Sequence, residues 1–205
     1  SGGTIAAHWV PTILEALECG FDVASGLHQR LTNIAEVRDA AQRNHCQLFD
    51  VRHTATDLKT ATGLPRSGKR LLTVGTDCSV GKMYTALAVE KSMRARNLDA
   101  DFIATGQSGI FISGKGLAID CVVADFISGA VEQLSPENDA NHWDIIEGQG
   151  SLFHPSFAGV TRSGTPKIRS RIPVTLRGPG QDGRRADCRS NCGVVAAGLV
   201  IRIAE

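Results

Sequence analysis

Apolar residues recur with a helical period near the start of the chain. Ile13, Leu14 and Leu17 fall on one face of a helix that would cover residues 9–17. Pro11 lies in the first turn of this segment, where proline is well tolerated because the first backbone N–H groups of a helix have no partner within it. The pattern therefore predicts a helix over residues 9–17.

Short apolar runs with strand character alternate with helical segments over the next 30 residues. Residues 21–25 and 48–51 are predicted as strands. Between them a helix is expected to begin after Asn33, because Glu36 follows three residues later as in a capping box. Residues 1–52 are therefore expected to be the C-terminal part of an αβ domain whose beginning is absent.

A second alternation of strands and helices follows a segment without periodicity. Residues 53–69 are rich in Thr, Gly, Pro and basic residues and are predicted as a linker. Buried strands are then expected at 71–74, 101–104 and 143–146, and a helix at 121–134. This order predicts an α/β fold with a doubly wound parallel sheet.

A glycine-rich segment joins the first of these strands to a helix. Successive backbone N–H groups in such a turn form a nest for an anion, and the helix N-terminus adds the positive end of its dipole. Lys82 adds a mobile positive charge. The segment predicts a phosphate-binding loop in a P-loop NTPase-like domain at residues 70–160, although a plain strand–turn–helix connection is the alternative. The loop consists of Gly75, Thr76, Asp77, Cys78, Ser79, Val80, Gly81, Lys82 and Met83.

The loop departs from the common pattern in two ways. Five residues separate Gly75 from Gly81 where the usual spacing is four, and Met83 stands where Ser or Thr usually binds Mg²⁺. Met83 therefore counts against rapid phosphoryl transfer. The remaining oxygen-bearing candidates for a metal ion are Asp77, Thr85 and Glu147.

Polar residues follow two predicted strands at their carboxyl ends, where α/β proteins bind ligands. Glu147 follows the strand at 143–146 and is a candidate base or metal ligand, with a turn or helix-capping carboxylate as the alternative. Residues 105–109 can be interpreted either as a substrate-binding loop or as an ordinary polar crossover loop. The expected substrate-binding residues are Thr105, Gln107, Ser108 and Gln149.

Several segments resemble known families. The long spacing of the phosphate loop resembles that of dethiobiotin synthetase and related amidoligase-type P-loop proteins. Longer segments are similar to the DgcN-type family, the N-acetyltransferases of D-glutamate catabolism formerly known as a domain of unknown function. Residues 5–53 resemble the end of that family's N-terminal domain, which implies a partial Rossmann-like domain at 1–52. The segments in the P-loop domain are Val74–Met83, Ala104–Gly109, Val122–Ala130 and Asp144–Phe157.

This resemblance implies acetyl transfer from acetyl-CoA to the amino group of D-glutamate. Coenzyme A carries a diphosphate that the loop could hold without Mg²⁺. Lys82 and Glu147 are the expected catalytic residues, with Glu147 as the candidate base. Gln107 and Gln149 are candidate donors to the developing oxyanion.

Two other functions stay open on the residues alone. The first is ATP-dependent ligation, in which Lys82 and Mg²⁺ would stabilise the transferring phosphoryl group. The second is a nucleotide-binding regulatory module without turnover. The expected cofactor is therefore acetyl-CoA or ATP, with Mg²⁺ as a candidate metal.

The net charge of +1 hides an uneven distribution. Residues 1–160 carry 13 Lys and Arg against 18 Asp and Glu, a balance of −5, whereas residues 161–205 carry 9 against 3, a balance of +6. The family resemblance stops at Val160, and neither helical nor strand periodicity is evident in residues 161–192. A shifted reading frame is the favoured interpretation of this basic tail. A nucleic-acid-binding arm is the alternative, but no aromatic residues interleave its arginines.

Composition restricts the environment and the partners. The six cysteines form no CxxC pair, no secretory signal is visible, and no apolar run could span a bilayer. We therefore expect a cytoplasmic protein without membrane partners. The family resemblance implies a small-molecule substrate such as D-glutamate. A homo-oligomer without nucleic acid partners is also expected.

Overall fold

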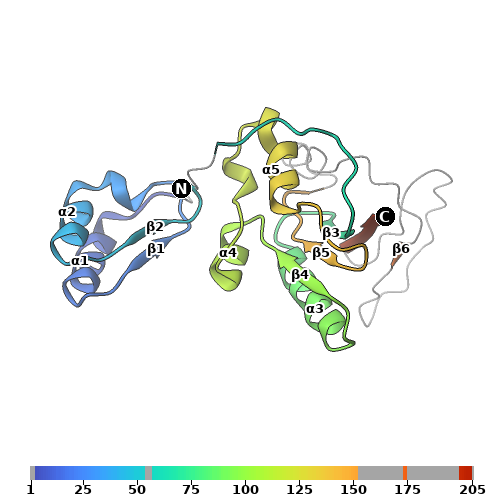
Figure 1. Ribbon diagram of the computed structural model, residues 1–205. Coiled ribbons are helices and arrows are strands. Elements are labelled where there is room, and N and C mark those ends of the chain that lie inside the picture. The colour runs from blue at the N-terminus through green and yellow to red at the C-terminus, as the bar shows by residue number, and fades with distance from the viewer. Residues whose placement is uncertain (1–2, 54–56, 152–172, 175–198, 205) are drawn as a thin grey trace.

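The computed structural model describes residues 3–53, 57–151, 173–174 and 199–204 (Figure 1). They form an N-terminal unit, residues 3–53, and a C-terminal unit that contains the rest. The N-terminal unit has two helices, and a short parallel sheet in which β1 pairs with β2. Its elements are the 3₁₀ turns Ala7–Trp9 and Leu31–Asn33, the helices α1 (Val10–Glu18) and α2 (Ala35–Arg43), and the strands β1 (Val23–Ser25) and β2 (Leu48–Asp50).

The predicted apolar face of the first helix builds the core of the N-terminal unit. Leu17 is fully buried, and Ile13 and Leu14 pack beside it against α2. The expected capping box of α2 is wrong. The helix has Ile34 as its N-cap and no side-chain capping bond, because Asn33 belongs to the preceding 3₁₀ turn.

The C-terminal unit is an α/β layer around a five-stranded sheet, ordered β4-β5-β3-β7-β6. Strands β4, β5 and β3 are parallel, which confirms the predicted α/β fold with a parallel sheet. The strands are β3 (Lys69–Gly75), β4 (Ala100–Ile103), β5 (Trp143–Ile146), β6 (Pro173–Val174) and β7 (Leu199–Ala204). The helices are α3 (Lys82–Arg94), α4 (Gln107–Ser113) and α5 (Ile127–Leu134), with 3₁₀ turns at Ile119–Cys121 and Ala124–Phe126.

The basic tail contributes two strands that the sequence pattern did not predict. Strand β7 pairs antiparallel with β3 along Arg70 to Gly75, and β6 pairs antiparallel with β7. The absence of strand character expected for residues 161–192 is therefore wrong at β6, whereas β7 lies beyond that range. The rest of that segment, on which the frameshift interpretation depends, lies outside the described residues.

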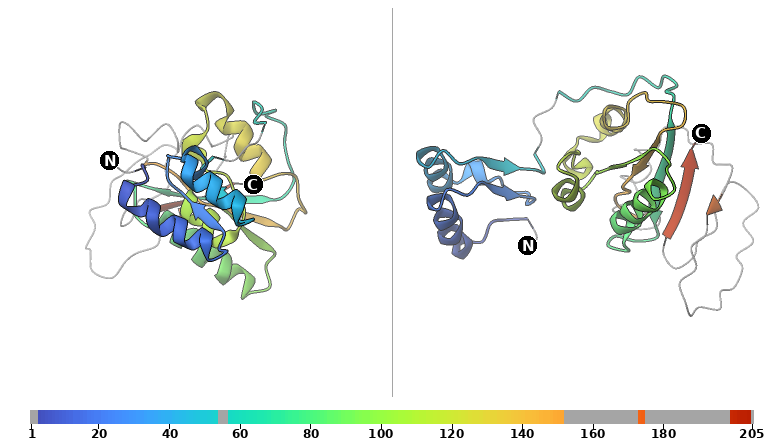
Figure 2. Two further views of the ribbon diagram at one scale, coloured as in Figure 1. Left: turned by 90° about the vertical axis from the view of Figure 1, so that its left-hand side faces the viewer. Right: turned by 60° about the horizontal axis from the view of Figure 1, so that its bottom comes forward.

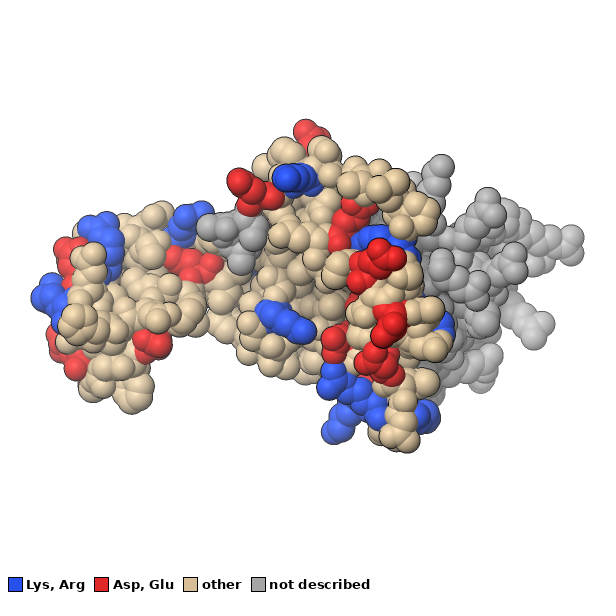
Figure 3. Space-filling view, viewed as in Figure 1, with Lys and Arg blue, Asp and Glu red and all other residues tan. Residues whose placement is uncertain are grey.

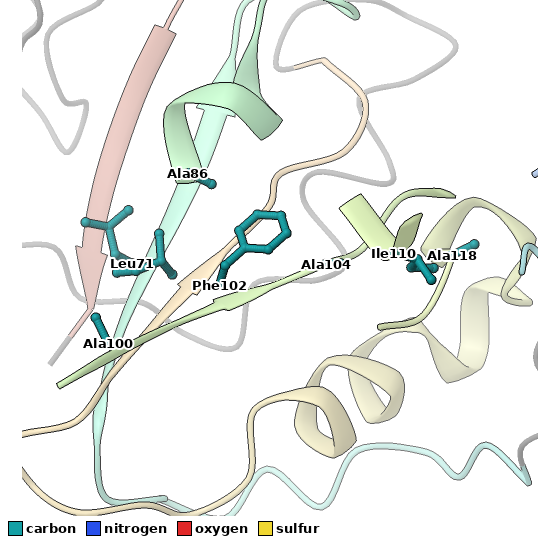
Figure 4. Close-up of a cluster of buried hydrophobic side chains, with 8 residues drawn as sticks. Leu71, Ala86, Ala100, Phe102, Ala104, Ile110 and Ala118 are labelled. Carbon is teal, nitrogen blue, oxygen red and sulfur yellow. The ribbon is translucent and has the colours of Figure 1, made fainter. Parts of the chain in front are cut away.

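The main core of the C-terminal unit lies between α3 and one face of the sheet. Leu71, Phe102 and Ile145 come from three neighbouring strands and pack with Ala86 of α3 (Figure 4). Alternate residues of a strand point to the same face, so Glu147, two residues after Ile145, lies on this side too. The core therefore fixes the strand ends from which the candidate site is built.

The connection between the units is held against α5. Glu132 of α5 accepts hydrogen bonds from the backbone N–H groups of Thr62 and Gly63, at 2.8 and 3.0 Å. A Cβ atom at Gly129 would lie 1.7 Å from the carbonyl oxygen of Lys59, so only glycine allows this close approach. Residues 57–68 thus lie along α5 by specific contacts.

A buried polar network closes the other end of the sheet. The Nδ1 atom of His142 lies 2.8 Å from Asp99, and its Nε2 atom lies 3.3 Å from Asp144. Asp144 also accepts a hydrogen bond from Ser135, and Arg70 donates to the Ser135 hydroxyl at 2.7 Å. This network joins β3, β5 and the end of α5.

The charge of His142 should make stability depend on pH. Burial alone would lower the pKa of His142, but the hydrogen bond to Asp99 and the nearby carboxylates outweigh it and raise that pKa above 6.5. Protonation of His142 therefore stabilises the fold below pH 6.5, and this contribution is lost as pH rises through the raised pKa. Urea denaturation at a series of pH values should show the free energy of unfolding falling over that range.

Two variants check this assignment. His142→Gln should lower the free energy of unfolding at pH 6 by about 1–3 kcal/mol, because the buried carboxylate of Asp144 loses its charged partner. It should also flatten the pH dependence above pH 6.5. His8→Gln, at an exposed position, is the matched control and should leave both unchanged. An unaltered pH profile in His142→Gln would contradict the assignment.

Candidate functional site

The predicted phosphate-binding loop contains left-handed backbone residues of the kind that an anion nest uses. It leaves β3 at Gly75 and enters α3 at Lys82 (Figure 1). Ser79 and Gly81 have positive φ angles of 58° and 91°, so left-handed residues interrupt the turn just before the helix. Such residues turn neighbouring N–H groups toward a common side, where they can bind an anion together with the helix N-terminus.

Lys82 lies inside this loop. Its side chain is buried, and its Nζ atom donates a hydrogen bond to the carbonyl oxygen of Asp77 at 2.9 Å. Burial lowers the pKa of Lys82, while electrostatic interactions with Cys78, Asp77 and Glu147 oppose that shift. A phosphate group in the loop would offer this ammonium group a stronger acceptor than a backbone carbonyl.

Glu147 is the buried carboxylate of the site. It directly follows β5, and its Oε2 atom accepts hydrogen bonds from the N–H groups of Thr105 and Gly106 at 3.0 and 3.1 Å. The Gln149 side chain also donates to it. Burial raises the pKa of Glu147 above its ordinary value of 4.5, and these hydrogen bonds and the charge of Lys82 only partly counteract the shift.

Three glycines allow Glu147 to reach this position. A Cβ atom at Gly109 would lie 2.4 Å from Oε2 of Glu147, and one at Gly106 would lie 2.4 Å from the Gln149 amide. A Cβ atom at Gly148 would lie only 1.6 Å from the carbonyl oxygen of Thr73. Gly148 therefore lets the end of β5 press against the end of β3, where the phosphate loop begins.

Other predicted residues surround this centre. Asp77 is exposed, and its carboxylate accepts a hydrogen bond from the N–H of Cys78 at 2.7 Å. Met83 packs against the main core, and Thr85 is part of α3, where its N–H donates to Gly81. The loop positions Thr76 and Val80 are half-buried and exposed, respectively.

The predicted substrate loop is partly helical. Thr105 is buried, and its hydroxyl donates to the carbonyl oxygen of Glu147 at 2.6 Å. Gln107 and Ser108 form the first turn of α4, which the sequence analysis did not predict. The stem of Gln107 lies against Gly26 of the N-terminal unit, and Ser108 is exposed.

One contributor to the site was missed. The buried Ser151 donates a hydrogen bond from its hydroxyl to the carbonyl oxygen of Thr76 at 2.7 Å. It thereby ties the segment after Glu147 to the phosphate loop. The signal was present in the Glu-Gly-Gln-Gly-Ser segment, since a small polar residue there falls at the same strand end.

The described residues show neither a metal cluster nor a membrane-spanning helix. Among them, no group of three or more His, Cys, Asp or Glu side chains is placed to hold a metal ion, so the Mg²⁺ ligands Asp77, Thr85 and Glu147 stay a prediction. Within the same residues, no helix has the length and apolar character needed to cross a membrane.

Known proteins resemble the chain over both units. Two curated relatives carry the name D-glutamate N-acetyltransferase. The one from Pseudoalteromonas sp is 60% identical over 161 residues, and the one from Tritonibacter scottomollicae is 52% identical over 160. Each alignment covers 78% of this chain and 48% of the relative, so the chain spans about half the length of these relatives.

A solved structure and two family descriptions agree with this likeness. The crystal structure of a DUF1611 family protein from Anabaena variabilis matches with a TM-score of 0.70 and 38% identity, over 80% of this chain and 49% of that one. Residues 1–54 match the Rossmann-like domain described as DUF1611_N, and residues 59–163 match the P-loop domain described as DUF1611_C. The resemblance deduced from the motifs is thereby confirmed, and the chain belongs to the DUF1611 family, a family named as a domain of unknown function.

Proposed function

We propose that the chain acts as a D-glutamate N-acetyltransferase with acetyl-CoA as the acetyl donor. The names of the two curated relatives support this activity. The observation that carries the proposal is the position of Glu147, a buried carboxylate with a raised pKa beside a phosphate-binding loop. Such a group suits a general base, whose pKa should lie close to the working pH.

The phosphate loop would hold the diphosphate of acetyl-CoA. The backbone N–H groups before α3 and the ammonium group of Lys82 supply positive charge for it. Bound acetyl-CoA supplies an acetyl group activated as a thioester. Because Met83 offers no hydroxyl for Mg²⁺, the loop suits binding of a phosphate better than its cleavage.

Glu147 would act on the amino group of the substrate. Its carboxylate accepts a proton from the ammonium group of D-glutamate, which frees the nitrogen lone pair for attack on the thioester carbonyl carbon. The new N–C bond forms and the C–S bond breaks, and the sulfur leaves with the electron pair of that bond. The nitrogen then gives up its second proton, which neutralises the departing thiolate, so that the products are the amide and the free thiol of coenzyme A. The side-chain amides of Gln107 and Gln149 are the proposed donors to the carbonyl oxygen as it gains negative charge.

A direct assay separates this function from the alternatives. The purified chain is incubated with D-glutamate and either acetyl-CoA or ATP with Mg²⁺, and the products are separated by chromatography. N-acetylglutamate formed only with acetyl-CoA supports the proposal. ADP release that requires an added acid would instead indicate a ligase, and tight nucleotide binding without turnover would indicate a regulatory module.

Glu147→Gln should remove the base but keep the fold. The glutamine side chain retains an oxygen that can accept the hydrogen bonds from Thr105 and Gly106, whereas it cannot take up the proton. We expect kcat to fall by about 10²- to 10⁴-fold, the usual contribution of a general base. Glu36→Gln, the same change at an exposed position, is the control for steady-state kinetics. Unchanged kcat in Glu147→Gln would contradict the assigned base.

The raised pKa of Glu147 should also appear in the pH profile. Since the base acts in its ionised form, kcat/KM should increase with pH as Glu147 loses its proton, with a midpoint above 4.5. The measurement is kcat/KM for D-glutamate at saturating acetyl-CoA over a series of buffers. A low-pH limb with its midpoint at or below 4.5 would argue against Glu147 as the base.

Lys82→Ala should weaken acetyl-CoA binding specifically. A charge-assisted hydrogen bond contributes about 1.5–3 kcal/mol, which corresponds to a loss of about 10- to 100-fold in affinity. Isothermal titration with coenzyme A measures this loss without requiring turnover. Lys91→Ala removes the same charge from an exposed position of α3 and should bind normally. Equal affinities of the two variants for coenzyme A would show that the phosphate loop does not bind it.

A further inference from the structure

The carboxyl ends of the N-terminal strands point toward the C-terminal unit. Figure 2 shows β1 and β2 running toward α4. Gly26 follows β1, and Val51 and Arg52 follow β2. Val51 packs against the main core of the C-terminal unit. In parallel α/β sheets this edge is where ligands bind, so the N-terminal unit presents its functional edge to α4.

Arg52 joins the two units at this edge. Its Nε atom donates to the carbonyl oxygen of Gly26 at 2.8 Å, and its terminal guanidinium nitrogen pairs with the carboxylate of Asp120. The Arg52 side chain is 8% exposed, while that of Asp120 is 37% exposed. Burial of a guanidinium group is costly unless its donors are paired, so these partners hold Arg52 in a defined geometry.

The surface over α4 is mostly uncharged on the face shown in Figure 3, with a basic side chain within it. A second polar contact crosses the junction nearby, between the Sγ atom of Cys121 and the Nδ1 atom of His28 at 3.9 Å. Arg52 therefore links the loop after β1 to the C-terminal unit through its contacts with Gly26 and Asp120.

Gly26, which Arg52 holds in place, packs closely against the side chain of Gln107. A Cβ atom at Gly26 would lie 2.9 Å from both Cβ and Cγ of Gln107, and 3.0 Å from the ring of Phe111. Gln107 directly follows Gly106, whose N–H binds Glu147. The contacts thus run from Asp120 through Arg52 and Gly26 to the residue beside the proposed base.

We propose that Arg52 is a positioning residue for the amino-acid substrate. It holds Gly26 against Gln107, and Gln107 is thereby kept at a fixed place relative to Glu147. This inference rests on the proposed function, in which Gln107 faces the reacting substrate. The acetyl-CoA subsite at the phosphate loop is built from other residues, so the two substrates should respond differently to the loss of Arg52.

Kinetics of Arg52→Gln test this difference. The variant should raise the KM for D-glutamate by about tenfold, within the range of typical coupling between sites, and leave the KM for acetyl-CoA unchanged. Arg38→Gln, at an exposed position of the same unit, is the control and should resemble the parent chain. Equal rises in both KM values, or no rise in either, would overturn the proposal.

A second variant and a second measurement guard against simple misfolding. Gly26→Ala keeps the ion pair but pushes on Gln107, and it should give the same selective rise in KM for D-glutamate. Hydrogen exchange measured by mass spectrometry should show faster exchange of the α4 amides in Arg52→Gln than in Arg38→Gln. If the parent chain does not acetylate D-glutamate, the proposed function fails while exchange still decides the positioning role. Equal α4 exchange in the two variants would overturn it.

Discussion

The burial of one carboxylate, that of Glu147, is the constraint around which the C-terminal unit is arranged. An ionised carboxylate out of water is costly unless donors surround it. Those donors are the backbone N–H groups of Thr105 and Gly106 and the amide of Gln149. The positive charge of Lys82 also favours the ionised form of the Glu147 carboxylate. Every one of these partners comes from a strand end or from the phosphate loop, so the site depends on the parallel sheet that aligns them.

The need for close approach explains where the glycines are. Gly148 has no room for a side chain, since a Cβ atom would lie 1.6 Å from the backbone of Thr73, and its N–H donates to the Thr73 hydroxyl at 3.0 Å. Larger residues at Gly106 or Gly109 would occupy the space that Gln149 and Glu147 fill. The glycines therefore have a packing role at the site beyond the flexibility that a loop requires.

The sequence predicted the elements that are determined by interactions between residues close together in the chain. The β3–loop–α3 segment and β5 carry clear apolar periods, and the rule that parallel strands end at one edge placed Glu147 near Lys82. Helix α4 was not predicted because it has only seven residues and contains Gly109, so it shows no clear helical period. The capping box at Asn33 fails because Asp50, distant in the chain, accepts hydrogen bonds from Leu31 and Thr32 and holds a 3₁₀ turn there. The Arg52–Asp120 pair joins residues 68 positions apart, and no short pattern encodes it.

The opposite pKa shifts of Lys82 and Glu147 connect binding with chemistry. Burial lowers the pKa of Lys82 and raises that of Glu147, so it disfavours the charged form of each group. A diphosphate in the loop would favour the ammonium form of Lys82 through its negative charge. The same negative charge would raise the pKa of Glu147 further, because like charges disfavour ionisation. Under the proposed function, binding of the acetyl donor therefore makes Glu147 a stronger base for the amino group that it must deprotonate.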